Sequence, residues 1–152
     1  MRKFQEGSIS EEQLKVLMKA AQLAPSASNR QPYKFIIVKD NELKKSLQRK
    51  ASMQRFVGKA AVIFVGIGDL EHEKWYKVDI AIAIQQIFLQ AVELGLGACW
   101  IGAFEEEKVK EVLKIPQNMQ VVAFLPVGIP DQDPPARPRK SLDELFSIDY
   151  YK

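Results

Sequence analysis

The sequence predicts a single domain of mixed α and β structure, and two observations carry that prediction. The 152-residue chain has the size of one domain, and a chain of this size buries roughly two-thirds of its unfolded surface. Stretches with helical periodicity alternate with continuous apolar runs that are typical of strands covered on both faces. Because 47% hydrophobic and 27% charged residues are ordinary globular values, we expect one domain over residues 1–152.

The first element is a helix from Glu11 to about Leu23. Ser10 and Gln13 have the spacing of a capping box, in which each side chain bonds the other residue's backbone N–H. Apolar residues recur at helical spacing behind it, namely Leu14, Leu17, Met18 and Ala21. A strand follows at Tyr33–Val38, which is rich in aromatic and β-branched residues.

A second helix and a central strand come next. Asp40 can cap a helix that contains Leu43 and Leu47. The continuous apolar run Ala61–Ile67 predicts a strand covered on both faces, and therefore a central one. A short polar connection of residues 68–77 leads to the next helix.

The long helix from Asp79 to about Leu94 is apolar around nearly its whole circumference. Asp79 is its expected N-cap, and Gly95 and Gly97 end it. Its apolar residues are Ile80, Ala81, Ile82, Ala83, Ile84, Ile87, Phe88, Leu89, Ala91, Val92 and Leu94. A helix that is apolar all round must be buried on all sides, and one small sheet cannot cover it. A second subunit is the economical explanation, and a helix enclosed within one chain is the alternative.

The C-terminal third continues the mixed order of elements. We expect a short strand at Ala98–Gly102, a charged surface helix at Glu105–Leu113 and a buried strand at Gln120–Val127. Prolines then keep the chain extended, at positions 126, 130, 134, 135 and 138. Ser141 and Glu144 form a second capping box for a final short helix.

Composition excludes several classes of protein and site. The 22 basic and 19 acidic residues give a net charge of +3 without a basic block, which argues against nucleic acid as a partner. The single cysteine, Cys99, excludes an intramolecular disulfide, and without a basic-then-apolar leader we expect a cytoplasmic protein. Glutamines interrupt the apolar stretch Ile80–Ile101, so no membrane span is expected. The lone His72 leaves no metal site and no thiol–imidazole catalytic pair to expect.

The loop between the first helix and the first strand carries the most informative polar residues. Pro25 stops the helix, and Pro32 pushes the residue before it into extended geometry. Hydroxyl and amide groups between the prolines suit a ligand rich in N–H and C=O, and they belong to Ser26, Ser28, Asn29 and Gln31. The same residue types also build ordinary helix-to-strand connections, which is the alternative interpretation.

The spacing P-S-x-x-N-x-Q-P-[WY]-x-F in this loop resembles the flavin-binding loop of the nitroreductase family, which are FMN-dependent homodimeric oxidoreductases. The resemblance implies an α+β, nitroreductase-like fold with a central, mostly antiparallel sheet flanked by helices. It also implies that the loop contacts FMN through Pro25, Ser26, Ala27, Ser28, Asn29 and Gln31.

Residues 95–104, Gly-Leu-Gly-Ala-Cys-Trp-Ile-Gly-Ala-Phe, resemble the segment that passes along one edge of the flavin in that family. The resemblance implies FMN contacts from Trp100, Ile101 and Gly102. Main-chain N–H groups there can reach flavin N5 and O4, and Gly102 permits close approach because it has no Cβ. The family's acidic residue before this glycine is replaced by Ile101, so only main-chain contacts are expected.

Basic residues near both ends of the chain resemble the family's remaining FMN contacts. Arg137 and Arg139 are similar in position to the residues that hold the phosphate, which needs fixed cations. A solvated basic stretch near a terminus is the alternative. Arg2, within Met1-Arg2-Lys3-Phe4, matches the basic position against the flavin pyrimidine, where a cation stabilises the charge of reduced flavin. The family's earlier Arg and Ser phosphate contacts have no counterpart in the sequence.

The connection at residues 68–77 is shorter than the family's usual lid, which implies an open and shallow pocket. His72, Trp75 and Tyr76 lie in this connection or at its end. They are candidates to stack on a substrate or nicotinamide, and ordinary surface packing is the alternative.

Taken together, the resemblances imply an NAD(P)H-dependent flavin oxidoreductase that works as a homodimer with tightly bound FMN at two interface sites. Electrons pass from NAD(P)H through the flavin to a small acceptor, such as a nitroaromatic or quinone, by a ping-pong mechanism. No side chain is expected to be a catalytic acid or base. The alternatives are a flavin-binding dimer without efficient turnover, serving as a carrier or regulatory module, and a structural dimerisation domain that binds no cofactor.

Overall fold

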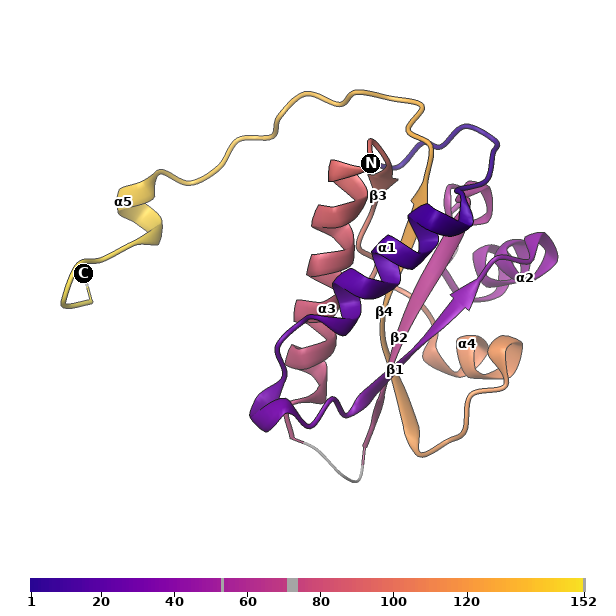
Figure 1. Ribbon diagram of the computed structural model, residues 1–152, viewed down its shortest axis with the longest axis horizontal. Helices are drawn as coiled ribbons and strands as arrows, with labels where there is room; N and C mark the ends of the chain where they lie inside the picture. The colour runs from indigo at the N-terminus through magenta and orange to yellow at the C-terminus, as the bar shows by residue number, and fades with distance from the viewer. Residues whose placement is uncertain (53, 71–73, 152) are drawn as a thin grey trace.

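A four-stranded antiparallel sheet forms the centre of the protein in the computed structural model, which describes residues 1–52, 54–70 and 74–151 (Figure 1). The order across the sheet is β1-β2-β4-β3. The strands are β1 (Tyr33–Val38), β2 (Val62–Asp69), β3 (Gly97–Ala98) and β4 (Met119–Gly128). The expected α+β architecture with an antiparallel sheet is confirmed, and the four strand ranges agree closely with the sequence patterns except for β3.

Strand β2 is buried on both faces, as its continuous apolar run predicted. It pairs with β1 on one side and β4 on the other. Val62 and Phe64 belong to one core, and Ile63, Val65 and Ile67 belong to a second core on the opposite face. The sheet therefore separates two hydrophobic cores, each of which needs its own covering layer.

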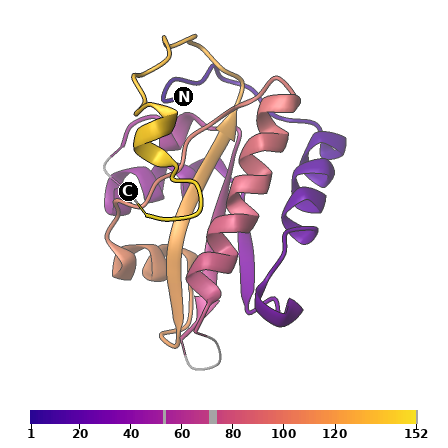
Figure 2. The same ribbon diagram turned by 90° about the vertical axis from the view of Figure 1, so that its left-hand side faces the viewer.

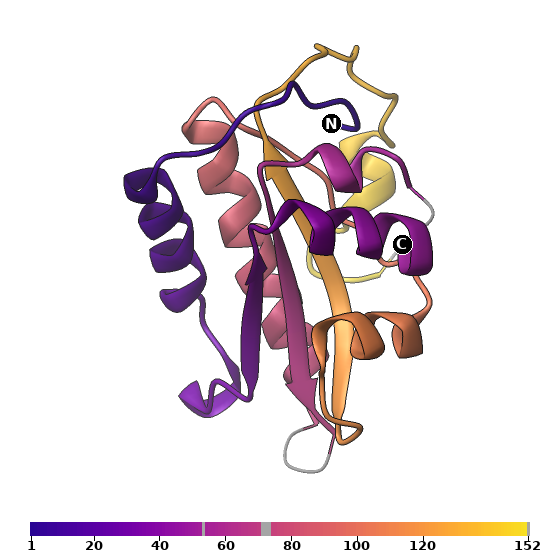
Figure 3. The same cartoon turned by 90° about the vertical axis from the view of Figure 1, so that its right-hand side faces the viewer.

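Helices supply both layers. Helices α1 (Glu11–Gln22) and α3 (Tyr76–Glu93) cover one face, with α3 in the foreground of Figure 2. On the other face lie α2 (Asn41–Leu47) and α4 (Glu106–Leu113), as Figure 3 shows. Three short turns complete the body, namely η1 (Ala27–Asn29), η2 (Gln48–Ser52) and η3 (Val57–Lys59).

Helix α1 begins as its sequence predicted. Ser10 Oγ accepts a hydrogen bond from Gln13 N at 3.1 Å, and Gln13 Oε1 accepts one from Ser10 N at 2.9 Å. The helix buries Leu14, Leu17 and Ala21. Met18 was expected on the same face, but it is 47% exposed and lies outside the core. Met18 follows Leu17 by one residue, and successive helical residues point in different directions.

Helix α3 begins earlier than predicted. Its first residue is Tyr76, and Trp75 precedes it, so Asp79 lies inside the first turn and is not the N-cap. The Asp79 side chain is 3% exposed and bonds a distant loop rather than its own helix. At the other end, Gly95 has a φ of +71°, as expected for a glycine that ends a helix.

Only one side of α3 is covered within the chain. Ile80, Ile84 and Ile87 are fully buried against α1 and the sheet. On the outward side, Val78, Leu89 and Val92 are 48%, 55% and 56% exposed. We call these three residues the outer stripe of α3.

The chain leaves the body after Pro130 and continues as an arm of residues 131–151 (Figure 1). Every residue of the arm is exposed. It is extended until α5 (Leu142–Leu145), which begins with the predicted capping box of Ser141 and Glu144. The expected extended segment and final short helix are therefore confirmed.

Candidate functional site

The loop Ser26–Gln31 holds a strained conformation by bonding to itself. Ser28, Asn29 and Gln31 have φ values of 50°, 54° and 52°, the left-handed region that costs non-glycine residues about 1–2 kcal/mol each. Ser26 Oγ accepts a hydrogen bond from Gln31 N at 3.1 Å. Gln31 Nε2 donates to Asn29 O at 3.1 Å and to Asn29 Oδ1 at 3.2 Å. Gln31 is thus committed to bracing the loop, while the Ser28 and Asn29 side chains stay exposed.

Asp79 ties this loop to helix α3. Its Oδ1 accepts a hydrogen bond from Ala27 N at 3.1 Å, across 52 residues of sequence. Its Oδ2 is buried and has no hydrogen-bond partner in the described part of the chain. Burial raises the pKa of Tyr33, and the nearby Asp79 carboxylate raises it further. The sequence reasoning missed this anchor, because a carboxylate at the start of a helix is normally interpreted as a cap.

The residues after β3 differ in how their main-chain N–H groups are used. Ile101 N donates to Phe124 O at 2.9 Å, and Ile101 O accepts from Phe124 N at 2.9 Å. Ile101 therefore cannot offer its N–H to a flavin, and the prediction is corrected at this residue. The next residue, Gly102, is exposed, and no described residue accepts a hydrogen bond from its N–H.

Space for a ligand remains around Gly102. A Cβ placed there would meet nothing closer than Trp100 Nε1 at 3.7 Å, so packing within the chain does not require a glycine. Trp100 itself is 41% exposed. The predicted strand at Ala98–Gly102 is shorter than expected, because only Gly97–Ala98 and a single bridge at Ile101 pair with β4.

Arg2 lies between two residues whose positions are fixed, Met1 beside β3 and Lys3 beside the start of the arm. Phe4 forms a bridge with Pro130, and Asp131 N donates to Lys3 O at 3.0 Å. The Met1 side chain covers Gly97, where an added Cβ would come within 2.5 Å of Met1 Cγ. The exposed Arg2 side chain therefore belongs to the same end of the molecule as β3.

Arg137 and Arg139 lie on the exposed arm, which extends away from the body in Figure 1. Arg139 Nη1 donates only to the carbonyl of Pro138, at 3.3 Å. Neither arginine forms an ion pair with a described carboxylate. Their guanidinium groups are free to bind an anion.

The predicted FMN contacts are divided among separate places in one chain. The loop Ser26–Gln31 precedes β1, at one edge of the sheet, and Gly102 follows β3 at the opposite edge. Three strand spacings separate these edges, about 14 Å. The two places also differ in position along the strands. The first residue of β1 pairs with Gly68, which pairs with Gln120 near the start of β4. Strand β3 pairs instead with Gly128, the last residue of β4. A single chain therefore does not bring the loop together with Arg2 or Gly102.

The residues expected on the substrate side differ in their roles. Tyr76 is only 7% exposed, and its hydroxyl is hydrogen-bonded to the Gln120 side chain, so it is a packing residue and not a stacking surface. Trp75 is 49% exposed and lines a cavity of about 200 Å³ with Pro25, Ser26 and Asp79. His72 lies outside the described residues.

Other classes of site find no support in the described residues. No three His, Cys, Asp or Glu side chains among them are grouped so that they could hold a metal ion. Within the same residues, no helix has the length and apolar character needed to cross a membrane.

Comparison with known proteins places the chain among flavin-dependent reductases. The model of the Nitroreductase family matches residues 1–59 and 44–129. The FMN reductase (NADPH) of Bacillus subtilis (strain 168) is 32% identical, over 99% of this chain and 70% of that protein. An FMN-dependent nitroreductase from Clostridium difficile R20291 has a TM-score of 0.90 at 29% identity, over 99% of this chain and 94% of that one. The NADPH:FMN oxidoreductase of Vibrio harveyi complexed with NAD+ has a TM-score of 0.91 at 28% identity, over 100% and 74%.

Proposed function

The chain belongs to the nitroreductase family, which makes it an NAD(P)H-dependent flavin oxidoreductase with FMN as its cofactor, and we propose that it acts as a homodimer on small electron acceptors. The family and the fold expected from the motifs are confirmed. The proposed acceptors are nitroaromatic compounds, quinones and similar molecules. When bound, FMN supplies the redox chemistry, taking a hydride from NAD(P)H and passing electrons to the acceptor in ping-pong order.

The donor and acceptor groups of the chain fit a flavin mononucleotide. The exposed Ser28 and Asn29 side chains offer both donors and acceptors to a ring with alternating N–H and C=O groups. The uncommitted N–H of Gly102 offers a main-chain donor in an open position. The unpaired guanidinium groups of Arg137 and Arg139 suit a phosphate, whose charge needs more than one cation.

Each of these residues has a proposed task. Arg137 and Arg139 hold the phosphate, and Arg2 places a cation near the flavin pyrimidine. Ser26, Ser28 and Asn29 orient the ring and ribityl chain, and Gly102 donates through its N–H. Pro25, Ala27, Gln31 and Trp100 shape the site. No side chain is assigned as a catalytic acid or base.

Two copies of the chain are needed to gather these groups around one cofactor. The loop Ser26–Gln31 and Gly102 lie at opposite edges of the sheet, too far apart for one ring system to touch both. Helix α3 presents its outer stripe to solvent, and exposed apolar surface of this kind is typical of protein interfaces. The arm extends away from its own body, and we infer that its arginines reach a neighbouring molecule.

The observation that carries the proposal is the braced loop Ser26–Gln31, which combines the family's flavin-binding spacing with exposed polar groups in a fixed conformation. The test is an absorbance spectrum of the purified protein before and after FMN is added and excess is removed. We expect a retained flavin spectrum that NADH or NADPH bleaches under anaerobic conditions. Retained flavin that neither nucleotide bleaches would instead support a carrier without turnover.

The phosphate contacts can be tested separately. The double variant Arg137→Ala/Arg139→Ala should lose FMN on gel filtration, whereas the parent keeps it. Lys108→Ala removes a surface cation that pairs with Glu111 on α4, at 3.2 Å, and should leave FMN retention unchanged. Equal retention by the arginine variant and the parent would contradict the proposed phosphate site.

A further inference from the structure

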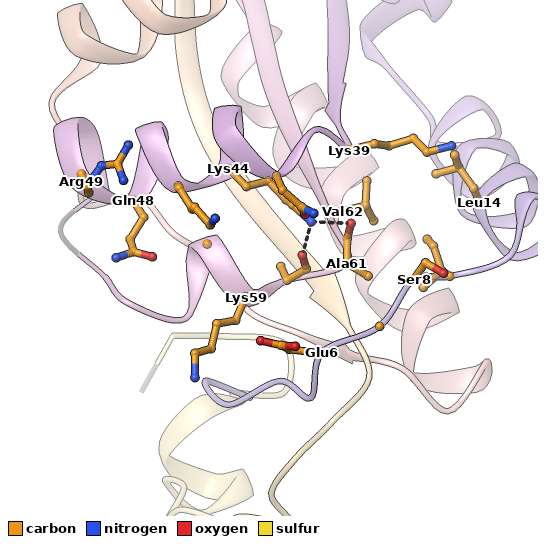
Figure 4. Close-up of a pocket in the computed structure, with 16 residues that line it drawn as sticks. Glu6, Ser8, Leu14, Lys39, Lys44, Gln48, Arg49, Lys59, Ala61 and Val62 are labelled. Atoms are coloured by element: carbon orange, nitrogen blue, oxygen red, sulfur yellow. Dashed lines mark hydrogen bonds between the residues drawn. The ribbon is translucent and has the colours of Figure 1, made fainter.

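A hollow of about 850 Å³ lies between α2, η3, the start of β2 and the N-terminal segment before α1 (Figure 4). We call it the basic cavity. Pockets that bind small molecules commonly measure about 300–1,000 Å³. None of the residues assigned to FMN lines it, so its occupant is a separate question.

Lys44 forms part of the wall of the basic cavity and is unusually buried for a lysine. Its side chain is 4% exposed, and its Nζ donates to Ala60 O at 2.7 Å and to Ala61 O at 3.0 Å. An ammonium group has three donors, so one remains. Among the described residues no carboxylate forms an ion pair with it. Neutral carbonyls satisfy hydrogen bonds but leave the charge uncompensated.

The buried charge of Lys44 carries a cost. Burial lowers its pKa, and the negative charge of Asp40 offsets only part of that effect. A buried ion without a counterion is destabilising unless a ligand or partner neutralises it. An anion in the basic cavity would supply that neutralisation.

Two further cations of the cavity wall form no ion pair with any described carboxylate. Arg49 and Lys59 are exposed, and neither pairs with a carboxylate within residues 1–52, 54–70 and 74–151. In Figure 4, Arg49 lies at the far end of the helical segment that continues α2, and Lys59 lies on the segment below it, with its side chain directed away from that helix.

The remaining lysines at the cavity are already neutralised, and only one acidic residue lines it. Lys39 pairs with Glu11 and Lys45 pairs with Glu42, so these two lysines add little. Glu6 is the one acidic residue among those that line the cavity. Three cations without a carboxylate partner among the described residues and one carboxylate thus line this concave site, where low-dielectric walls concentrate the field.

We propose that the basic cavity binds a small phosphorylated molecule through its phosphate. A phosphate carries more than one negative charge and therefore favours several fixed cations. Arg49 offers a forked pair of donors, and Lys44 and Lys59 offer ammonium groups. Ser8, Asn41 and Gln48 also line the cavity and provide neutral hydrogen-bonding groups for the rest of the ligand.

The test measures binding of pyrophosphate and of ADP to the FMN-loaded protein by isothermal titration calorimetry at constant ionic strength. Arg49→Gln/Lys59→Gln should weaken the binding of both probes by about tenfold or more. Lys50→Gln is the matched control, because Lys50 adjoins Arg49 but pairs with Glu111 at 3.5 Å and does not line the cavity. It should change the dissociation constants by less than about twofold.

A second readout covers the buried lysine. Lys44→Met removes the charge with similar length, and pyrophosphate should no longer raise the thermal midpoint of this variant. If Lys44→Met does not fold, the pyrophosphate affinity of Arg49→Gln/Lys59→Gln still tests whether the basic cavity binds phosphate. Tighter binding of ADP than of pyrophosphate would support a nucleotide, and the reverse order would support a simpler phosphate.

Several outcomes would overturn the proposal. The first is an unchanged pyrophosphate affinity in Arg49→Gln/Lys59→Gln. The second is equal binding of sodium sulfate, which would indicate general attraction of anions. The third is an increase in flavin fluorescence when pyrophosphate is added, because release of FMN would place the probe at the cofactor's phosphate site. Binding of polyglutamate without binding of pyrophosphate would indicate an acidic protein partner instead.

Discussion

Helices α1 and α5 begin with the same capping box but end in opposite environments. Ser10 and Gln13 start α1, and Ser141 and Glu144 start α5. Helix α1 buries its apolar face against α3 and the sheet. In α5 and the residues that follow it, the large apolar side chains are 57–83% exposed, apart from Tyr151 at 99%; they are Leu142, Leu145, Phe146, Ile148, Tyr150 and Tyr151. Local sequence starts a helix, but only distant partners bury it.

The contrast divides the molecule into a body, residues 1–130, and the arm. The body has two cores, one on each side of the sheet. The arm has apolar side chains but no core to join. The outer stripe of α3 is the corresponding unpaired surface on the body. We therefore expect changes in the arm and in the outer stripe of α3 to alter assembly or cofactor binding, and changes in either core to alter stability.

Removing the arm should have the largest effect on cofactor binding. A chain that ends at Asp131 keeps the Lys3–Asp131 ion pair of 3.0 Å but loses Arg137 and Arg139. Two charge-assisted contacts to phosphate are lost, so FMN affinity should fall by about a hundredfold or more. Fluorescence titration measures the affinity, and the thermal midpoint of the body should stay nearly unchanged. Undiminished FMN affinity would contradict the role given to the arm.

A charge in the outer stripe of α3 should dissociate the proposed dimer. Leu89→Asp places a carboxylate in the middle of an interface that otherwise buries apolar surface, which should raise the dimer dissociation constant by about a hundredfold. Analytical ultracentrifugation measures this constant. Leu43→Asp is the control, because Leu43 is 40% exposed on α2, on the opposite face of the sheet. If both variants sediment like the parent, α3 does not form the interface.

Loss of the Asp79 anchor should loosen the loop Ser26–Gln31 within an intact body. Asp79→Ala removes the acceptor of the Ala27 N–H, so hydrogen exchange at that amide should accelerate and FMN should bind about tenfold more weakly. Asp79→Asn keeps an acceptor of the same shape and should restore most of the protection. Amide exchange followed by NMR checks both variants. Equal exchange rates at Ala27 in all three proteins would show that Asp79 does not hold the loop.

The two capping boxes allow a smaller and more direct comparison. Ser10→Ala should lower the free energy of unfolding by about 1 kcal/mol, because the folding of α1 is coupled to the core. Ser141→Ala should leave urea unfolding of the body unchanged and reduce only the helix content of residues 142–145. Urea titration followed by circular dichroism measures the first effect, and Cα chemical shifts measure the second. A shift of the urea midpoint by Ser141→Ala would indicate that the arm packs on the body.

The smallest expected effect is a difference between the two helices in acid, where α5 should lose helix content before α1 does. Hydrogen bonds from the Ser141 backbone and side chain lower the pKa of Glu144 below its ordinary value of 4.5. The resulting stabilisation of α5 is therefore fully present above pH 4.5 and is lost as the pH falls through the lowered pKa. Chemical shifts of residues 142–145 should move toward coil values in this range while those of α1 persist. Simultaneous loss of both helices would contradict the independence of the arm.

Most of the fold could be predicted from the sequence because its signals are local. The capping boxes, the glycine end of α3 and the continuous apolar run of β2 each depend on neighbouring residues. The middle of α2 shows where such signals fail. Lys44 is buried and Leu43 is 40% exposed, the reverse of the expected pattern. The carbonyls of Ala60 and Ala61, which accept from Lys44, lie too far along the chain for periodicity to indicate them.

The candidate site was predicted in parts and not as an arrangement. Motif spacing identified the loop at Ser26, but it could not show that Asp79 anchors Ala27 from 52 residues away. It also could not show that the N–H of Ile101 donates to the carbonyl of Phe124. A single bridge between two distant residues produces no periodic pattern in the sequence. Long-range hydrogen bonds decide which groups are left over for a ligand.

The division of the proposed flavin contacts between the two edges of the sheet has a practical consequence for anyone who handles this protein. When half of a binding site belongs to a neighbouring molecule, cofactor loading follows mass action between polypeptides as well as between polypeptide and ligand. A concentrated stock should therefore release FMN on simple dilution, which a rise in free-flavin fluorescence would show. Enzymatic rates measured at nanomolar protein would then understate the specific activity unless FMN is kept in the buffer.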